Sequence, residues 1–134
     1  MNTPMVTPAA TKEGVVYAVD LYDLKKIELN GKVTTLASQL QGKSWSQFFV
    51  EDQHQLMGLC TDANQNVYVA SYGNKKVKKV SPTGRVTTVV ETNSMWSPTG
   101  VLAAPNGDLW VLECTVTNAV RVECFKKNGT RMVY

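Results

Sequence analysis

The strongest constraint on the fold is an internal repeat. One pattern of apolar runs and turns occurs three times in 134 residues, over residues 6–37, 57–90 and 99–134. A chain made of repeated units folds by stacking each unit on its neighbours, because a single unit cannot bury its own apolar faces. The repeat must therefore be interpreted before any individual motif.

Each repeat predicts four short β-strands joined by tight turns. In the second repeat, Leu59–Asp62 is apolar, VYVAS (67–71) is β-branched and aromatic, and residues 77–80 contain both valine and lysine. The turns carry Asn, Gly or Pro, which suit the backbone conformations of tight turns. No segment has a sustained helical periodicity.

The repeat predicts an all-β fold, a β-propeller of three four-stranded blades in a single domain over residues 1–134. Equivalent positions, such as Tyr17, Tyr68 and Trp110, are about 42 to 53 residues apart, which is the spacing of propeller blades. The alternative is a plain β-sandwich of hairpins, in which the same turn chemistry would not be expected to recur at three registers. A long inter-blade loop, residues 38–56, separates the first two blades.

The second repeat, GLCTDANQNVYVASYGNKKVKKVSPTGRVTTVV (58–90), resembles a blade of the NHL-repeat family. The usual form of that blade is G-[ILV]-x-x-D-x-x-G-N-[IV]-Y-V-A-D, followed by N-x-[RK]-[IV]. Residues 99–125 follow it with LWVLE in place of YVAD, and residues 6–37 follow it loosely. The chain also resembles the gluconolactonase, or senescence-marker-protein, group of six-bladed propellers. The second resemblance implies a hydrolase with a divalent metal in the central channel.

Three blades do not close a ring, because propellers generally have about four to eight. The outer faces of the first and third blades would then be exposed apolar surfaces. Two copies around a twofold axis would supply six blades, the number in the resembling group. We therefore expect a homodimeric six-bladed ring. The alternative is a piece cut from a longer propeller.

Candidate ligand-binding residues lie in the loops that join the second strand to the third, and one blade to the next. In a propeller these loops surround the funnel over the central channel. The set is Trp45, His54, Tyr72, Asn74, Trp96, Glu113 and Asn118. An aromatic rim with a few polar groups suits a small molecule or a peptide. The alternative for the aromatic residues of the long loop is packing against a blade or the dimer seam.

Two of these residues are also candidates for catalysis. His54 is the only histidine, and the unperturbed pKa of a histidine, about 6.5, suits a general base. Glu113 ends an apolar strand, where a buried charge needs a partner or a ligand. An arginine or lysine partner for Glu113 is the structural alternative.

The gluconolactonase resemblance implies carboxylate and amide ligands for a cation such as calcium at the blade starts. At two of the corresponding positions this sequence has Met57 and Thr99. Methionine is not a ligand for a hard cation. We therefore expect no metal cofactor and a ligand-binding scaffold, with the gluconolactonase-type hydrolase as the alternative function.

Composition narrows the possible partners. Fourteen Lys and Arg against eleven Asp and Glu give a net charge of +3, too small an excess to indicate nucleic acid. The lysines of residues 75–79 are interspersed with valine and predict a solvated strand, with a basic interaction edge as the alternative. No apolar run predicts a membrane span, and no signal peptide is visible, so we expect a cytoplasmic protein. Three cysteines, Cys60, Cys114 and Cys124, predict small buried side chains rather than disulfides.

Overall fold

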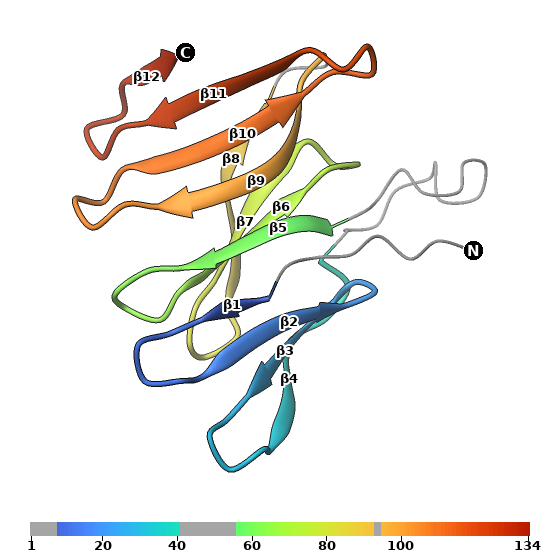
Figure 1. Ribbon diagram of the computed structural model, residues 1–134, viewed down its shortest axis with the longest axis vertical. Helices are drawn as coiled ribbons and strands as arrows, with labels where there is room; N and C mark the ends of the chain where they lie inside the picture. The colour runs from blue at the N-terminus through green and yellow to red at the C-terminus, as the bar shows by residue number, and fades with distance from the viewer. Residues whose placement is uncertain (1–7, 41–55, 93–94) are drawn as a thin grey trace.

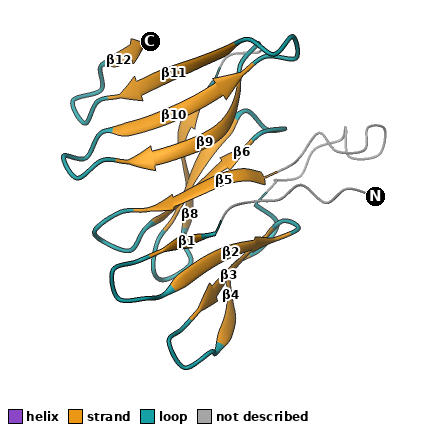
Figure 2. Ribbon diagram, in the orientation of Figure 1, coloured by secondary structure: helices purple, strands orange, loops and turns teal. Residues whose placement is uncertain are grey.

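The computed structural model describes residues 8–40, 56–92 and 95–134, which form three antiparallel four-stranded sheets. Figure 1 shows the sheets stacked in a fan, in the order of the chain. The described residues contain strands and turns (Figure 2), and none of their segments is a helix that could cross a bilayer. The all-β prediction is confirmed.

Within each sheet the strands follow the order of the chain, and each pairs antiparallel with the next. Sheet 1 contains β1 (Ala9–Ala10), β2 (Val16–Asp20), β3 (Asp23–Ile27) and β4 (Val33–Ala37). Sheet 2 contains β5 (Leu56–Thr61), β6 (Val67–Ser71), β7 (Lys76–Val80) and β8 (Val86–Glu91). Sheet 3 contains β9 (Ser97–Ala103), β10 (Leu109–Cys114), β11 (Val120–Phe125) and β12 (Arg131–Val133).

The first strands of sheets 2 and 3 begin earlier than the apolar pattern predicts, because they include glycines that resemble turn residues. Gly58 lies within β5, where its missing side chain allows the neighbouring strand to approach closely. A Cβ atom there would lie 2.8 Å from the carbonyl oxygen of Thr99 in β9. The glycine is therefore required by backbone packing between two sheets and not by a turn. The first repeat begins at Val6, outside the described residues, and the first described strand of this repeat is β1.

The turns define two opposite edges of the fan. Turns between the first and second strands lie on the left in Figure 1, and we call this side the first-turn edge. Turns between the third and fourth strands lie on the same side. Turns between the second and third strands lie on the right, and we call this side the second-turn edge.

Side chains alternate between the two faces of each strand, so every sheet has two faces that a neighbour can cover. We call the face that carries Tyr17 in sheet 1, Tyr68 in sheet 2 and Trp110 in sheet 3 the leading face. The opposite face, which carries Val16, Val67 and Leu109, is the receiving face.

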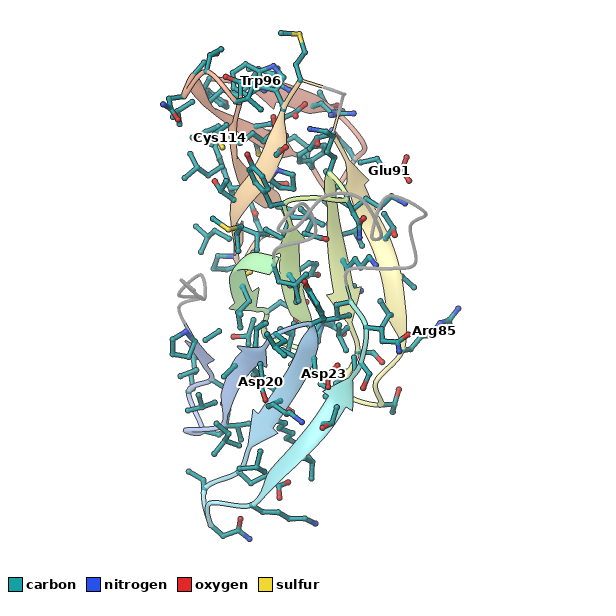
Figure 3. All side chains as sticks on the ribbon, turned by 90° about the vertical axis from the view of Figure 1, so that its right-hand side faces the viewer. Asp20, Asp23, Arg85, Glu91, Trp96 and Cys114 are labelled. Atoms are coloured by element: carbon teal, nitrogen blue, oxygen red, sulfur yellow. The ribbon has the colours of Figure 1, made fainter. Side chains whose placement is uncertain are left out.

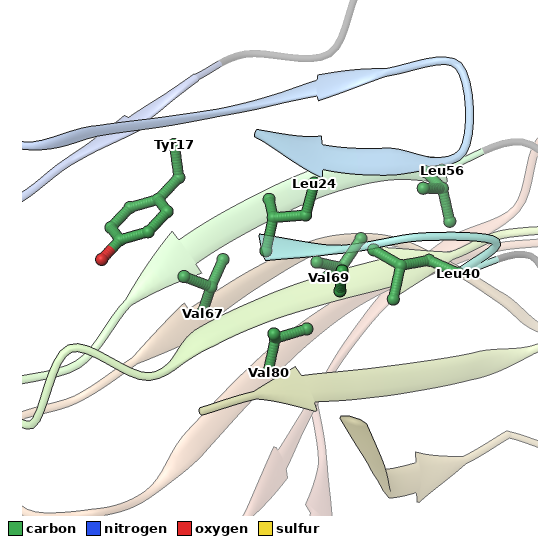
Figure 4. Packing of buried hydrophobic residues seen from close by; sticks show 8 residues of the cluster. Tyr17, Leu24, Leu40, Leu56, Val67, Val69 and Val80 are labelled. Atoms are coloured by element: carbon green, nitrogen blue, oxygen red, sulfur yellow. The ribbon is translucent and has the colours of Figure 1, made fainter. Parts of the chain in front are cut away.

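The two seams inside the chain follow one rule: the leading face of one sheet packs on the receiving face of the next. At the first seam, Tyr17 and Leu24 of sheet 1 pack with Val67, Val69 and Val80 of sheet 2 (Figure 4). All five side chains are at most 1% exposed. This seam is the larger of the two apolar clusters and fixes sheet 1 on sheet 2.

The second seam joins sheets 2 and 3. Val77 and Val90 of sheet 2 pack with Leu109 and Val111 of sheet 3, and the partly buried Tyr68 packs against them. Burial of this apolar surface is the main stabilising term for the stack.

We predict that Leu24→Ala destabilises the protein by about 2–5 kcal/mol, because it removes a fully buried side chain from the first seam. Leu29→Ala, at a turn position where the side chain is 76% exposed, is the matched control and should change stability by less than about 0.5 kcal/mol. Denaturant unfolding measures both. Equal effects of the two substitutions would contradict the seam described here.

Candidate functional site

The sequence-predicted site residues fall at the second-turn edge where the structure describes them. Tyr72 and Asn74 lie in the turn between β6 and β7, and Asn118 lies in the turn between β10 and β11 with a positive φ of 65°. Figure 3 looks onto this edge and shows Trp96 over sheet 3. Trp45 and His54 lie outside the described residues, so their roles stay predictions.

The structure joins two of the candidates, Trp96 and Glu113, through a third residue. The side chain of Glu113 is fully buried, and the Nε atom of Arg121 donates a hydrogen bond of 2.6 Å to its Oε2 atom. The Arg121 guanidinium lies 4.2 Å from the centre of the Trp96 ring. This geometry is a cation–π contact on an ion pair, and it matches the structural alternative for Glu113.

A second ion pair extends this cluster along sheet 3. Glu123, on the same face as Glu113, accepts a hydrogen bond of 2.8 Å from Nε of Arg131. The second guanidinium nitrogen, Nη2, of Arg121 lies 3.6 Å from Oε2 of Glu123. We call these four residues the carboxylate cluster. It lies on the receiving face of sheet 3, which packs on sheet 2.

Each carboxyl group of the cluster has one buried oxygen without a hydrogen-bond donor. These atoms are Oε1 of Glu113 and Oε2 of Glu123. Burial without a donor disfavours the ionised form of a carboxyl group.

The pKa values follow from this arrangement. Burial raises the pKa of Glu113, and the neighbouring charge of Glu123 adds to the effect, although Arg121 opposes it. Burial also acts to raise the pKa of Glu123, but the hydrogen bonds from Arg131 and Glu113 outweigh burial and lower it. Folding therefore shifts the pKa values of the two carboxyl groups in opposite directions.

Sequence reasoning found Glu113 but missed Arg121, Glu123 and Arg131. A signal for two of them was present: arginine and glutamate alternate with valine over residues 120–123, so Arg121 and Glu123 share one face of a strand. Arg131 reaches the cluster from β12, which sequence alone could not align with β11.

The lysines of sheet 2 are less free than the sequence predicted. Nζ of Lys78 donates a hydrogen bond of 2.6 Å to the carbonyl oxygen of Leu40, and Nζ of Lys75 donates one of 2.9 Å to Oγ of Ser97. Burial and the charge of Lys76 lower the pKa of Lys78. The prediction of a solvated strand is therefore wrong for Lys78. Because Lys75 and Lys78 already form hydrogen bonds within the chain, a basic interaction edge would have fewer lysines available for a partner.

The cysteines differ in their surroundings. Cys124 is fully buried, as predicted, whereas Cys60 and Cys114 are half-buried. Burial raises the pKa of Cys60 to about 11, so its thiol is not a nucleophile at neutral pH. Met57 and Thr99, at the positions where the resemblance places metal ligands, lie in β5 and β9. Among the described residues, no three His, Cys, Asp or Glu side chains gather as a metal site would require.

A cavity of about 610 Å³ lies at the first-turn edge, lined by turns from all three sheets. This is the opposite edge from the one where the sequence placed the funnel. The cavity and the carboxylate cluster are therefore separate features.

Solved structures with the same arrangement of sheets identify the fold. Virginiamycin B lyase from Staphylococcus aureus matches 98% of this chain with a TM-score of 0.69 and 21% sequence identity. A gluconolactonase from Xanthomonas campestris matches 92% with a TM-score of 0.69 and 15% identity. The calcium-binding protein regucalcin from Agrobacterium tumefaciens matches 79% with a TM-score of 0.58 and 17% identity. The three sheets are blades of a β-propeller.

The chain is shorter than these propellers, since it covers 40%, 44% and 36% of their lengths. No protein-family model matches the sequence, and no curated protein matches it. The structural likeness at these low identities establishes the propeller fold of the gluconolactonase-like proteins. It leaves the activity of this chain to be argued from its own residues.

We predict opposite effects for two isosteric substitutions in the carboxylate cluster. Because the pKa of Glu113 is raised by folding, its burial costs stability increasingly as the pH rises above the ordinary value of 4.5. Glu113→Gln mimics the protonated acid, so the variant should gain stability relative to the wild type as the pH rises from 4.5 to 8.

Glu123→Gln removes the charge that both arginines face, and it should cost about 1–3 kcal/mol at pH 7. Since the pKa of Glu123 is lowered by folding, this cost should shrink as the pH falls below 4.5. Urea unfolding at a series of pH values measures both variants. Parallel pH profiles for the two variants would contradict the opposite pKa shifts of Glu113 and Glu123.

Proposed function

We propose that this chain is a ligand-binding propeller scaffold that supplies three blades of a six-bladed ring, and that a second copy supplies the other three. The observation that supports this most directly is the residue pattern of the two end faces. The open leading face of sheet 3 and the open receiving face of sheet 1 repeat the pattern that forms the two seams inside the chain.

The leading face of sheet 3 has the apolar character of a buried seam. Leu112 is equivalent to Val19, and Val122 is equivalent to Leu24, because the two pairs of residues have the same register in their sheets. Leu24 is fully buried by sheet 2, whereas its equivalent Val122 is only partly buried, and Leu112 is 42% exposed. Other exposed apolar residues of this face are Leu102, Met132 and Tyr134. In the described strands of sheet 3, this face carries no charged side chain.

Gly100 adds backbone evidence for a missing neighbour. It occupies the same position in β9 as Gly58 in β5, where the glycine allows the next first strand to approach. A Cβ atom on Gly100 would contact only Leu112, 3.5 Å away on its own face. β9 packs directly beside Gly58, whereas no neighbouring strand among the described residues packs beside Gly100.

The receiving face of sheet 1 supplies the complementary surface. Val16, Ala18 and Ile27 on this face are partly exposed. Their equivalents in sheet 2 are Val67, Val69 and Val80, and all three are fully buried by sheet 1. If the leading face of sheet 3 packed on the receiving face of sheet 1 in a second copy, it would form a third apolar seam like the two inside the chain.

The number of copies follows from ring closure. Contacts between unlike faces of identical units produce a ring when the rotation closes. A ring made from whole copies of a three-blade unit contains a multiple of three blades, and six is the only multiple within the usual range of about four to eight. Two copies therefore close the ring, with two equivalent seams.

In such a ring the second-turn edges of six sheets would surround one opening of the central channel. Trp96, Tyr72, Asn74 and Asn118 lie at this edge and offer aromatic and amide groups to a small molecule or a peptide. Glu113 is occupied by Arg121 and supports the edge rather than the ligand. A gluconolactonase-type hydrolase is favoured less by these residues, because Met57 and Thr99 replace two of its expected metal ligands.

The test is the mass in solution. We predict that the purified chain has twice the chain mass of 14.8 kDa by light scattering at micromolar concentration. Leu112→Glu places a charge in the seam and should give a folded monomer. Leu29→Glu, at an exposed turn position outside both end faces, should remain a dimer. A stable wild-type monomer, or an open polymer, would contradict the proposal.

A further inference from the structure

The cavity at the first-turn edge has the size and construction of a small-molecule site. Its volume, about 610 Å³, lies within the range of about 300 to 1,000 Å³ that such sites occupy. Its lining includes small side chains at the ends of the three first strands, Ala10, Thr61 and Ala103. The rest of the lining comes from the three turns that follow these strands, here called the wall turns, and from Lys127.

The three wall turns have the same backbone structure. Each is closed by two hydrogen bonds, and the turn of sheet 2 shows the pattern: the Asp62 amide donates to the Asn66 carbonyl, and the Gln65 amide donates to the Asp62 carbonyl. In all three turns the fourth residue has a left-handed backbone. This residue is Gly14 in sheet 1 and Gly107 in sheet 3, with φ values of 86° and 91°, but it is Gln65 in sheet 2, with a φ of 63°.

Gln65 departs from the glycine of the other two wall turns. Lys75 and Asn118 are also non-glycine residues at the fourth position of their turns, with φ values of 56° and 65°. The turns between the third and fourth strands also have a glycine at this position in all three sheets, namely Gly31, Gly84 and Gly129. A side chain in the left-handed conformation costs stability relative to glycine. The side chain of Gln65 lines the cavity, and within the described residues it forms no hydrogen bond that would offset this cost. A ligand in the cavity would account for it.

The cavity also presents cationic groups from two different sheets. Lys12 lies in the wall of sheet 1, and Lys127 reaches the cavity from the last turn of sheet 3. The Lys127 stem passes over Gly107, where a Cβ atom would lie 3.0 Å from its Cδ atom. Among the described residues neither lysine has an ion-pair partner, whereas Lys126 lies 3.4 Å from Asp108.

One of the two carboxylates of the lining is held by hydrogen bonds from its own sheet. Asp62 is occupied within its own turn, where it accepts hydrogen bonds from the Asn64 and Asn66 amides and from the Tyr68 hydroxyl. These bonds, although burial opposes them, lower the pKa of Asp62. Glu13, beside Lys12, is the other carboxylate of the lining.

We propose that this cavity binds a small hydroxylated carboxylate. Lys12 and Lys127 bind the carboxylate, and the amides of Asn64 and Gln65 exchange hydrogen bonds with the hydroxyl groups, since an amide both donates and accepts. The residues proposed to bind all belong to one chain, so binding can be tested in a monomer as well as in a ring.

The test uses three four-carbon probes. Tartrate carries carboxylates and hydroxyls, succinate carries only carboxylates, and erythritol carries only hydroxyls. In ¹⁵N-labelled protein, tartrate should produce saturable shift changes at residues 11–13, 62–65 and 104–107. Succinate and erythritol should each bind about tenfold more weakly, because each lacks one set of contacts.

Variants separate a binding role from a structural one. Gln65→Gly should raise the melting temperature or leave it unchanged, and should weaken tartrate binding about tenfold. Lys127→Gln should weaken binding similarly. Lys32→Gln, in the corresponding last turn of sheet 1 and outside the cavity lining, should leave it unchanged.

Two outcomes would overturn the proposal: no saturable shifts at about 50 mM tartrate, well above a millimolar Kd, or unchanged binding in Gln65→Gly. Binding to a protein that is monomeric would support this site while contradicting the ring. A dimer that does not bind tartrate would support the ring while contradicting this site.

Discussion

The packing of unlike sheet faces is the constraint on which the rest of the structure depends. A four-stranded sheet with apolar residues on both faces is stable only when each face is covered. Sheet 2 satisfies this condition within the chain, and its residues Val67, Val69 and Val77 are fully buried. Sheets 1 and 3 satisfy it on one face each. The proposed ring, its channel and its two seams all follow from covering the remaining faces by the same rule.

Charged residues also lie on one of these packed faces. The receiving face of sheet 3 combines apolar Leu109 and Val111 with the carboxylate cluster, where Arg121 and Arg131 pair with Glu113 and Glu123. Such a cluster contributes less net stability than its short contacts suggest, because burial of the charges is costly. The cluster links side chains of β10, β11 and β12, and Trp96 covers Arg121.

The fold could be predicted from the sequence because it depends on periodic features. The strand alternation and the repeated glycine turns gave three four-stranded sheets, and only the starts of β5 and β9 were missed, because Gly58 and Gly100 resemble turn residues. The site was harder to predict. Glu113 stood out as a charge in an apolar strand, but its partner Arg121 lies on another strand, and Arg131 reaches Glu123 from a third. Pairing between strands is not visible in sequence. No sequence pattern pointed to Gln65, because only the structure shows that it occupies the same turn position as Gly14 and Gly107.

Cross-linking between copies tests directly whether unlike faces meet. Cys114 lies on the leading face of sheet 3 and Asp20 on the receiving face of sheet 1, and Figure 3 shows them at opposite ends of the stack with sheet 2 between them. A bismaleimide with a span of about 10 Å, the spacing of packed sheets, should join Cys114 of one copy to the new cysteine of another in Asp20→Cys. It should not join copies of the wild type. Cross-links between two Cys114 residues, or none in Asp20→Cys, would contradict head-to-tail packing.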